Sequence, residues 1–443
     1  MILAETDKYR AAVSITGRLT EAGYEALFAG GVVRDMVMGH GEDGDIDIAT
    51  NARPETVRKL FSHTIPVGAQ FGVIIVVESG IPFEVATFRS DMGIHDGRHP
   101  ADIVFTDARN DALRRDFTMN GLFFNPQTRE IIDFVGGKTD IAMKVVRAIG
   151  DPTLRFQEDY LRLLRAIRFA ARFDFSIEPT TWNAIKLEAC NITGISVERI
   201  FSELDKMLRS AHPDRAIDLL DRSGLLAVVL PEVTALKGVG QPREFHPEGD
   251  VFEHTRKALS LLGPHPTSAL AWSVLLHDIG KPQTMFVADR IRFNNHDQVG
   301  MQKAQEILKR LHASNSLVEE VTACIVNHMN FMQVRKMKLG TLKKFLSRPT
   351  IATEMELHRI DCLASHGDCG NIEFLQRELE RFRSETLKPA PLLRGRDLIE
   401  LGFRPGPLFG EILATVYEMQ LEEEISTREE AVRLVMDRFS PQK

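Results

Sequence analysis

Cysteine is scarce in this sequence, with four residues in a chain of 443. The four cysteines form no CxxC pair and are too sparse to cross-link a chain of this length. They are Cys190, Cys324, Cys362 and Cys369. We therefore expect reduced thiols and a cytoplasmic protein.

Long hydrophobic runs are also missing. No stretch reaches the roughly 18 apolar residues that a membrane-spanning helix needs. The start, MILAETDKYRAAVSI, lacks the basic segment and apolar run of a secretory leader. The sequence therefore predicts neither secretion nor a membrane partner.

The sequence also lacks an excess of positive charge. It contains 55 Lys and Arg and 62 Asp and Glu, which gives a net charge of −7. Nucleic-acid binding depends on local basic patches, so the total charge neither predicts nor excludes an RNA partner. Hydrophobic residues at 43% and charged residues at 26% are ordinary for a globular protein. The length predicts two or more domains.

The pattern of the chain changes along its length. Short β-type runs alternate with helical segments over residues 24–134, whereas helical periodicity dominates after residue 154. We predict an α/β head and a mainly α-helical body, with a loop at 90–100 and a domain boundary in the Gly- and Pro-rich segment 237–249. The predicted domains are a head at 1–150, a helical region at 151–240, a helical domain at 241–385 and a C-terminal helical tail at 386–443.

Two carboxylates stand two residues apart in DGDIDIAT, where Asp45 and Asp47 would leave the same face of a predicted strand. Such a pair suits Mg²⁺ bound together with substrate phosphates. Two metal ions could activate an attacking hydroxyl group and stabilise leaving pyrophosphate. The structural alternative is a solvated acidic strand end.

Two further features surround this pair. Gly30-Gly31 would place backbone N–H groups and a helix N-terminus beside a triphosphate, unless the glycines form an ordinary turn. Glu84 lies in a predicted hairpin strand, where it is either a third metal ligand or a surface acid paired with Arg89.

An ordered series of motifs spans the first half of the chain. The series is GGVVRD at 30–35, DIDIAT at 45–50, FEVATFR at 83–89, RRDFTMN at 114–120, EDYLRLLRAIRFAARF at 158–173 and SVERIFSEL at 196–204. It resembles the superfamily of class II tRNA nucleotidyltransferases and bacterial poly(A) polymerases. This resemblance implies a polymerase-beta-like nucleotidyltransferase head with a mixed sheet, in which Asp45 and Asp47, with Glu84 as a third member, bind catalytic Mg²⁺.

The same resemblance implies a binding site for the incoming nucleotide. The residues that would frame the triphosphate are Gly30, Gly31, Arg34 and Asp35. The residues that would hold phosphates and ribose are Arg114, Asp116 and Asn120.

A basic segment follows, with arginines three or four residues apart that gather on one side of a helix. They are Arg162, Arg165, Arg168 and Arg172. An ordinary amphipathic helix is the structural alternative. In the resembling superfamily EDxxR reads the base, which here implies Asp159 and Arg162. A carboxylate and a guanidinium together match the edges of cytosine and adenine but not those of uracil and guanine.

Finer features favour tRNA tailing. Residues 89–105 resemble the loop of enzymes that add the terminal A, and the GRRFxLAH-like block associated with bacterial poly(A) polymerases is absent. The predicted function is addition of CMP and AMP, from CTP and ATP, to the 3′ end of tRNA, with poly(A) polymerase as the alternative. The sequence DGD at 43–45 replaces the more usual Lys-Asp or Arg-Asp lead into the DxD motif, which leaves Asp43 as an extra acid with no assigned role.

The helical body carries a second set of candidate metal ligands. His254, the doublet His277-Asp278 and Asp361 follow the H…HD…D order of the HD phosphohydrolase superfamily, which they resemble. His296 and His328 could complete a two-metal site for a divalent transition metal or Mg²⁺. An active site of this kind would cleave phosphoesters, for example 2′,3′-cyclic phosphates at RNA ends.

Three alternatives remain open for the whole protein. The HD-type domain could be a vestigial scaffold that serves only to bind RNA. It could instead be the working centre of a phosphohydrolase whose head merely binds nucleotide. A non-catalytic RNA chaperone is the third alternative, which the full set of carboxylates in the head disfavours.

Overall fold

The structure is a computed structural model that describes residues 6–39, 44–68, 71–94, 100–242, 244, 246–382 and 389–439. The chain divides into two compact units. Unit 1 comprises Met1–Thr234 with Arg310–His312, and unit 2 comprises Ala235–Lys309 with Ala313–Lys443. The division after Thr234 falls close to the predicted boundary at 237–249. The finer division into four domains stays a prediction.

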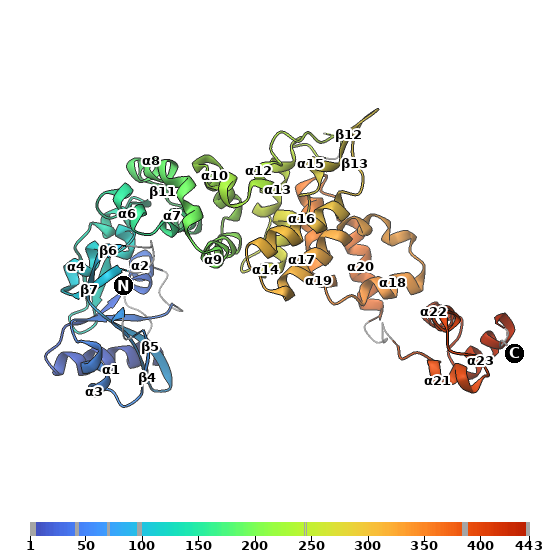
Figure 1. Cartoon of the computed structure of the whole chain (residues 1–443), viewed down its shortest axis with the longest axis horizontal. Helices are drawn as coiled ribbons and strands as arrows, with labels where there is room; N and C mark the ends of the chain where they lie inside the picture. Colours follow the sequence, from blue (N-terminus) through green and yellow to red (C-terminus); the bar gives the residue numbers. More distant parts are fainter. Residues whose placement is uncertain are drawn as a thin grey trace. The chain divides into compact units, whose positions relative to one another are not determined.

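Unit 1 is built on a seven-stranded sheet in the order β3-β4-β5-β2-β1-β8-β9 (Figure 1). Central β2 (Asp47–Thr50) pairs parallel with β5 (Ile81–Thr87) and antiparallel with β1 (Ala26–Ala29). The other strands of the sheet are β3 (Thr64–Gly68), β4 (Val73–Glu78), β8 (Leu122–Asn125) and β9 (Glu130–Asp133). This mixed sheet confirms the predicted fold class of the head.

Helices α1 (Asp7–Glu21) and α3 (Pro54–Leu60) pack together against the sheet (Figure 1). All four residues of β1 are buried because the strand is a continuous apolar run, ALFA, at the centre of the sheet. Leu27 of this strand packs with Phe88 and Phe123 in a common hydrophobic cluster. The rigid core therefore lies directly beneath the ends of β1 and β2.

The predicted hairpin around Ser79-Gly80 is confirmed. Both residues have positive φ, 54° and 77°, as a two-residue hairpin turn requires. The prediction of a loop at 90–100 is wrong for most of its length. There β6 (Arg89–Ile94) and β7 (Pro100–Phe105) pair as an antiparallel ribbon, and residues 95–99 between them lie outside the described part of the chain. The two strands read RSDMGI and PADIVF, and neither shows the regular alternation of apolar and polar residues by which a strand is recognised in a sequence.

Short elements connect the sheet to the helical part of unit 1. They are α2 (Gly31–Met38), α4 (Ala108–Leu113), the 3₁₀ turn η2 (Thr118–Asn120), α5 (Gly137–Ala142) and β10 (Val145–Val146). The helical part comprises α6 (Pro152–Glu158), α7 (Leu161–Phe173), β11 (Ser176–Ile177), α8 (Pro179–Glu188), η3 (Ala189–Gly194), α9 (Val197–Leu208), α10 (Pro213–Ser223), α11 (Leu225–Val229) and α12 (Pro231–Thr234).

Helix α7 is the centre of this helical part and contacts α9 and α10. Its apolar face is buried as the periodicity predicts, through Leu161, Leu164, Ile167 and Ala171. The segment 158–173 is nevertheless not one helix. Asp159 has extended dihedral angles, φ −157° and ψ 103°, and separates α6 from α7. The EDxxR motif therefore lies on a bend between two helices.

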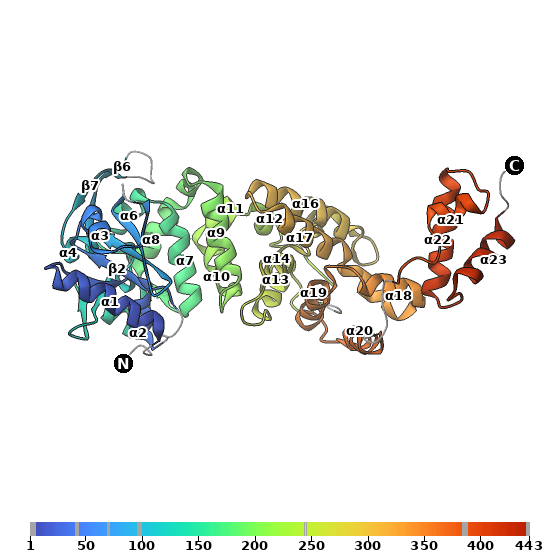
Figure 2. The same cartoon turned by 90° about the horizontal axis from the view of Figure 1, so that it is seen from below.

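The described residues of unit 2 are mainly helical, as Figure 2 shows. They include one short antiparallel ribbon of β12 (Met285–Val287) and β13 (Ile291–Phe293), labelled in Figure 1. Its helices are α13 (Val251–Ser260), α14 (Ser268–Leu276), α15 (Lys281–Thr284), α16 (His296–Arg310), α17 (Asn315–Asn327), η4 (His328–Lys336), α18 (Leu339–Leu346), α19 (Ile351–Ala364), α20 (Gly370–Arg381), α21 (Gly395–Glu400), α22 (Pro407–Leu421) and α23 (Arg428–Arg438).

Apolar α14 is central in unit 2 because α13, α17 and α19 all contact it, with Trp272 fully buried. A helix that is apolar on all sides needs such complete cover. No helix within the described residues is long and apolar enough to cross a membrane.

The close approach of α5 to the turn η2 generates a stability prediction. A methyl group on Gly137 would lie 2.2 Å from the backbone oxygen of Thr118. Gly137→Ala should therefore lower the free energy of unfolding of unit 1 by about 1–3 kcal/mol, the usual cost of overpacking a core. Thermal unfolding measures this effect. Gly194→Ala is the control, because nothing lies within 4 Å of the added methyl group, and an equal loss of stability in both variants would contradict the prediction.

Candidate active site and candidate metal centre

Strand pairing places two of the predicted acidic residues side by side. Ile48 of β2 pairs in parallel with Val85 of β5, so the preceding residues, Asp47 and Glu84, are neighbours at the same end of the sheet. On the other side, Asp47 is the partner of Ala29 in β1, and its Oδ2 lies 3.8 Å from the Cβ position of Gly30. The strand register therefore brings two carboxylates next to the Gly-Gly turn.

Asp45 is placed differently from the prediction. Strand β2 begins at Asp47, so Asp45 precedes it, and Nζ of Lys8 lies 2.9 Å from its Oδ1. Its side chain is 97% exposed. Asp45, Asp47 and Glu84 do not form a compact ligand group, and the compact groups found among the described residues are all in unit 2. Asp43 lies outside the described residues.

The charges near Asp47 oppose its ionisation. Partial loss of hydration raises the pKa of this carboxyl group to about 6. The nearby charges of Glu84 and Asp45 also raise the pKa, whereas Arg115 lowers it. Clustered carboxylates of this kind are stabilised when a cation binds between them. The donor set of the head therefore fits a hard divalent ion.

The Gly-Gly turn opens a helix in the way a phosphate site requires. Gly30 has φ 70°, a conformation that favours glycine, and α2 begins at Gly31. Arg34 on this helix donates to Oδ1 of Asn120 at 2.8 Å and to Asp35 at 2.8 Å. These bonds join the GGVVRD and RRDFTMN motifs, which are far apart in the sequence.

Asp116 anchors the second of these motifs to helix α7. Its carboxylate accepts hydrogen bonds from Arg165 Nε at 2.8 Å and from Asn120 Nδ2 at 2.9 Å. Burial opposes ionisation of Asp116, but Arg165 and Asn120 lower its pKa. The structure therefore brings together Arg34, Asp116 and Asn120 with Arg165.

Arg114 does not lie free to meet a ligand. It donates to Asp111 at 2.7 Å, and its backbone oxygen accepts hydrogen bonds from Arg155 at 3.1 Å and Arg162 at 3.4 Å. Its neighbour Arg115, which the sequence analysis overlooked, has its Nη1 3.3 Å from the Cβ position of Gly30 and lowers the pKa of Asp47. The two adjacent arginines in RRDFTMN could have indicated in the sequence that Arg115 belongs to the site.

The two expected base-reading residues are each held by another side chain. Arg199 of α9 donates to Asp159 at 2.7 Å. Arg162 pairs with Glu158 and donates to the backbone oxygen of Arg155 at 2.7 Å. These contacts fix the bend between α6 and α7, from which both side chains project.

Arg168 of α7 donates to Glu203 of α9 at 2.6 Å. Arg199 and Glu203 both belong to SVERIFSEL, so that motif supports the bend from α9. Sequence analysis identified the motif but assigned no role to these two residues.

Unit 2 brings all six predicted HD-type ligands into two overlapping groups. One contains His254, His277 and Asp278, and the other contains Asp278, His296 and His328, each with its candidate ligand atoms within 4.8 Å of one another. Asp361 joins the first group, with Oδ1 3.1 Å from Nε2 of His254.

Backbone carbonyls orient three of these imidazoles. Nδ1 of His277, His296 and His328 donates to the oxygens of Val274, Phe293 and Ile325. A carbonyl only accepts, so each neutral ring keeps its lone pair on Nε2. Nε2 of His296 and Nε2 of His328 lie 3.2 Å apart. Two facing lone pairs at this distance repel each other, and a bound cation removes the repulsion.

Asp278 connects the two groups. Its Oδ2 lies 3.2 Å from Nε2 of His277, and its Oδ1 lies 3.7 Å from Nε2 of His296. Oδ2 is buried and forms an ion pair with Nζ of Lys281, 2.7 Å away. A carboxylate with one oxygen toward each histidine group is suited to bridge two metal ions.

The surroundings act in opposite directions on two of the histidines. Burial lowers the pKa of His328 to about 4, and the neighbouring His296 and His277 act in the same direction. Burial opposes protonation of His254, but Asp361 and Glu248 raise its pKa to about 9. Because only a neutral imidazole binds a metal, His328 is in its metal-binding form near neutral pH, whereas His254 must release a proton when a metal binds.

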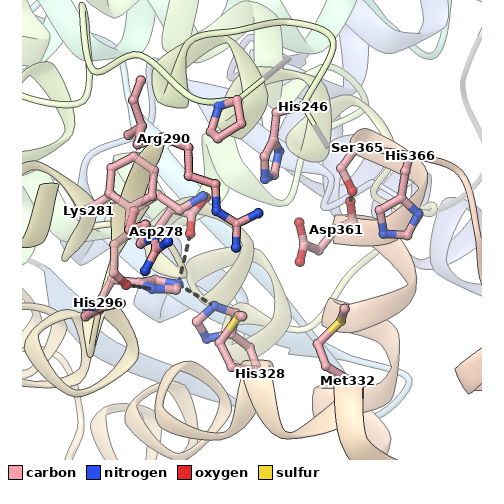
Figure 3. A pocket seen from close by; sticks show the side chains of 16 residues that line it. His246, Asp278, Lys281, Arg290, His296, His328, Met332, Asp361, Ser365 and His366 are labelled. Carbon is pink, nitrogen blue, oxygen red and sulfur yellow. Dashed lines mark hydrogen bonds and ion pairs between the residues drawn. The ribbon is translucent and has the colours of Figure 1, made fainter. Parts of the chain in front are cut away.

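Sequence analysis missed two residues of this centre, because they lie in the segment 237–249 that we predicted to be a domain boundary. Nδ1 of His254 lies 2.7 Å from Oε1 of Glu248, and Nδ1 of His246 lies 3.2 Å from the same oxygen. His246 lines a cavity of 580 Å³ together with Asp278 and Asp361 (Figure 3). A histidine and a glutamate two residues apart in a linker were the available signal.

Comparisons with known proteins agree with this geometry. The family model described as "Poly A polymerase head domain" matches residues 26–147, and the one described as "Probable RNA and SrmB- binding site of polymerase A" matches residues 174–237. The two matches cover the sheet of the head and helices α8 to α12. Neither covers the histidine groups of unit 2.

Among solved structures, the CCA-adding enzyme of Bacillus stearothermophilus in complex with CTP superposes with a TM-score of 0.78 at 27% identity, covering 98% of both chains. The CCA-adding enzyme of Bacillus pumilus is 44% identical over 210 residues, which is 47% of this chain and 52% of that protein. The chain thus spans about half the length of this curated relative.

A longer match extends into unit 2. The CCA-adding enzyme of Limosilactobacillus reuteri is 31% identical over 401 residues, covering 89% of this chain and 88% of that protein. The chain therefore belongs to the family of CCA-adding enzymes.

Proposed function

We propose that this protein adds CMP and AMP to the 3′ end of tRNA, using CTP and ATP and releasing pyrophosphate. The observation that carries the proposal is the 401-residue similarity to a protein named CCA-adding enzyme. The similarity to a CCA-adding enzyme solved with CTP supports the choice of nucleotide. Free cysteines at all four positions support the expected cytoplasmic location.

In this proposal, Asp47, Glu84 and Asp45 would hold Mg²⁺, which neutralises charge on the triphosphate and on the leaving pyrophosphate. The turn at Gly30-Gly31 presents backbone N–H groups to the triphosphate. The RNA 3′-hydroxyl attacks the α-phosphate in line with the leaving group, so no covalent enzyme intermediate forms.

Base selection is assigned to Asp159 and Arg162. The carboxylate accepts a hydrogen bond from an exocyclic amine, and the guanidinium donates to ring nitrogen or carbonyl acceptors. Cytosine and adenine both offer an amine beside an acceptor, whereas uracil and guanine do not offer this edge. The contacts of Asp159 with Arg199 and of Arg162 with Glu158 keep the pair in place without a nucleic-acid template.

Poly(A) polymerase is the alternative within the same superfamily. Incubating the purified protein with tRNA that lacks CCA and with single labelled nucleotides, followed by sequencing of the products, separates the two activities. Addition of two C residues and then one A supports the proposal. Runs of A would transfer the assignment to poly(A) polymerase.

Replacing either proposed metal-binding aspartate by asparagine should strongly reduce nucleotide transfer to the RNA. Asp47→Asn and Asp45→Asn should each lower the rate of nucleotide incorporation on the order of 10³-fold, because loss of a metal ligand forfeits several kcal/mol of transition-state stabilisation. Pyrophosphate release measures the rate. Asp7→Asn, an exposed acid on α1, is the matched control, and a rate near that of the wild type in Asp47→Asn would exclude its catalytic role.

Changes at the base-reading pair should alter selectivity rather than metal binding. Asp159→Ala and Arg162→Ala should lose most of the preference for CTP and ATP over UTP and GTP, because each removes one half of the hydrogen-bonding edge. Competition assays with all four nucleotides measure this preference. Arg109→Ala, exposed on α4, is the arginine control. Unchanged selectivity in both variants would refute the assignment.

We propose a second activity for unit 2, hydrolysis of phosphoesters at RNA ends or in nucleotides. The observation that favours it is the pair of ligand groups that share Asp278, each of which fits a divalent transition metal or Mg²⁺. Lys281 and Arg290 line the adjoining cavity and offer positive charge to a phosphate group (Figure 3). A scaffold that only binds RNA is the alternative.

A double dissociation tests this second activity. His277→Ala should abolish hydrolysis of a 2′,3′-cyclic nucleotide and reduce bound metal, while nucleotide incorporation stays near the wild-type rate. Asp47→Asn should give the reverse result, because the two centres use different ligands. Metal content is measured by mass spectrometry. Wild-type protein that binds metal but hydrolyses no phosphoester would favour the scaffold.

A further inference from the structure

The two ligand groups of unit 2 are not equivalent. We define position A as His254, His277, Asp278 and Asp361, and position B as Asp278, His296 and His328. Position A includes two carboxylates, whereas position B has only the carboxylate that the two positions share. A divalent ion at position A therefore meets more negative charge.

The outer hydrogen bonds differ as well. In position B, Nδ1 of both histidines donates to a backbone oxygen, that of Phe293 at 2.8 Å and that of Ile325 at 2.5 Å. In position A, His277 does the same toward Val274 at 2.9 Å. His254 is the exception, because its Nδ1 lies 2.7 Å from a carboxylate oxygen of Glu248.

This pair of residues is shielded from water. His254 is fully buried and the side chain of Glu248 is 9% exposed. The second oxygen of Glu248 is also buried and accepts no hydrogen bond within the described part of the chain. The charge of Glu248 therefore acts on the imidazole of His254, 2.7 Å away, and through it on Nε2, and it also acts on His246, 3.2 Å away.

A carboxylate behind a histidine ligand has two effects on a metal site. It fixes the ring so that Nε2 faces the metal, and it makes the ring a stronger donor than a carbonyl partner does. Loss of such an outer partner typically weakens metal binding about 10- to 100-fold. Glu248 contacts His254 and His246, and neither residue belongs to position B.

We infer that position A binds a divalent ion more tightly than position B, and that Glu248 is the positioning residue that strengthens position A through His254. The inference rests on the proposed metal centre of unit 2. It gives the segment 237–249 a role in metal binding, and it predicts that the two positions fill in order as the metal concentration rises.

The experiment is a titration of the full-length, chelator-treated protein with Mn²⁺ by calorimetry, with bound metal counted by mass spectrometry. Wild-type protein should bind in two separable steps. Glu248→Ala should raise the dissociation constant of the tighter step about 10- to 100-fold and leave the weaker step unchanged. Glu248→Gln should give an intermediate value, because its amide oxygen still accepts the hydrogen bond from Nδ1 but carries no charge.

Glu253→Ala is the matched control, since this glutamate is half exposed on α13 and pairs with Arg256 rather than with a ligand. It should titrate as the wild type does. The circular dichroism spectrum and thermal unfolding of Glu248→Ala should match those of the wild type, which shows that unit 2 of the variant is folded. If Glu248→Ala is not folded, the titration of Glu248→Gln tests the inference instead.

Two results would overturn the inference, and they differ from failure of the centre itself. An unchanged tighter step in both Glu248 variants would remove its role, and an equal loss in both steps would make Glu248 a support of the whole domain. Wild-type protein that binds no Mn²⁺ would instead overturn the metal centre, and the inference with it.

Discussion

The parallel pairing of β2 with β5, inside an otherwise antiparallel sheet, is the constraint on which the proposed nucleotide site depends. It sets Asp47 beside Glu84, while the antiparallel partner β1 delivers Gly30 to the same end of the sheet. Because these strands are hydrogen-bonded to each other, the two acidic side chains stay side by side. Partial loss of hydration raises the pKa of Asp47 to about 6, and the charges of Glu84 and Asp45 act in the same direction. The fold thus holds negatively charged side chains close together, and a bound cation would neutralise their charge.

Unit 2 also holds groups close together that repel each other, and in this unit they are histidines. Imidazoles whose Nε2 atoms lie 3.2 Å apart are held in place by outer partners, mostly backbone oxygens at the ends of helices and strands. In both sites the groups that would contact a ligand are fixed by a second layer of residues. Arg199 fixes Asp159 in unit 1, and Glu248 fixes His254 in unit 2. Such layers limit rotamer freedom and so preorganise a site before its ligand arrives.

Much of the head was predictable because local patterns coincide with the fold. The apolar run of β1, the Gly30-Gly31 turn, the Ser79-Gly80 hairpin and the buried face of α7 all follow the predicted pattern. The predictions failed where backbone pairing or a bend overrides local pattern. The strands β6 and β7 lie in a segment that was expected to be a loop, and Asp45 was expected inside a strand that begins only at Asp47.

The sequence by itself determined the residue types, the order of the motifs and the periodicity of the helices, because these depend on neighbours along the chain. It therefore led us to propose Asp45, Asp47 and the HD-type residues as metal ligands. Only the tertiary structure decided which groups meet, since hydrogen bonds such as that between Glu248 and His254 join a segment without regular pattern to a helix. The Asp45/Asp47 pair could be predicted from the sequence, whereas the residues that hold each site in place could not.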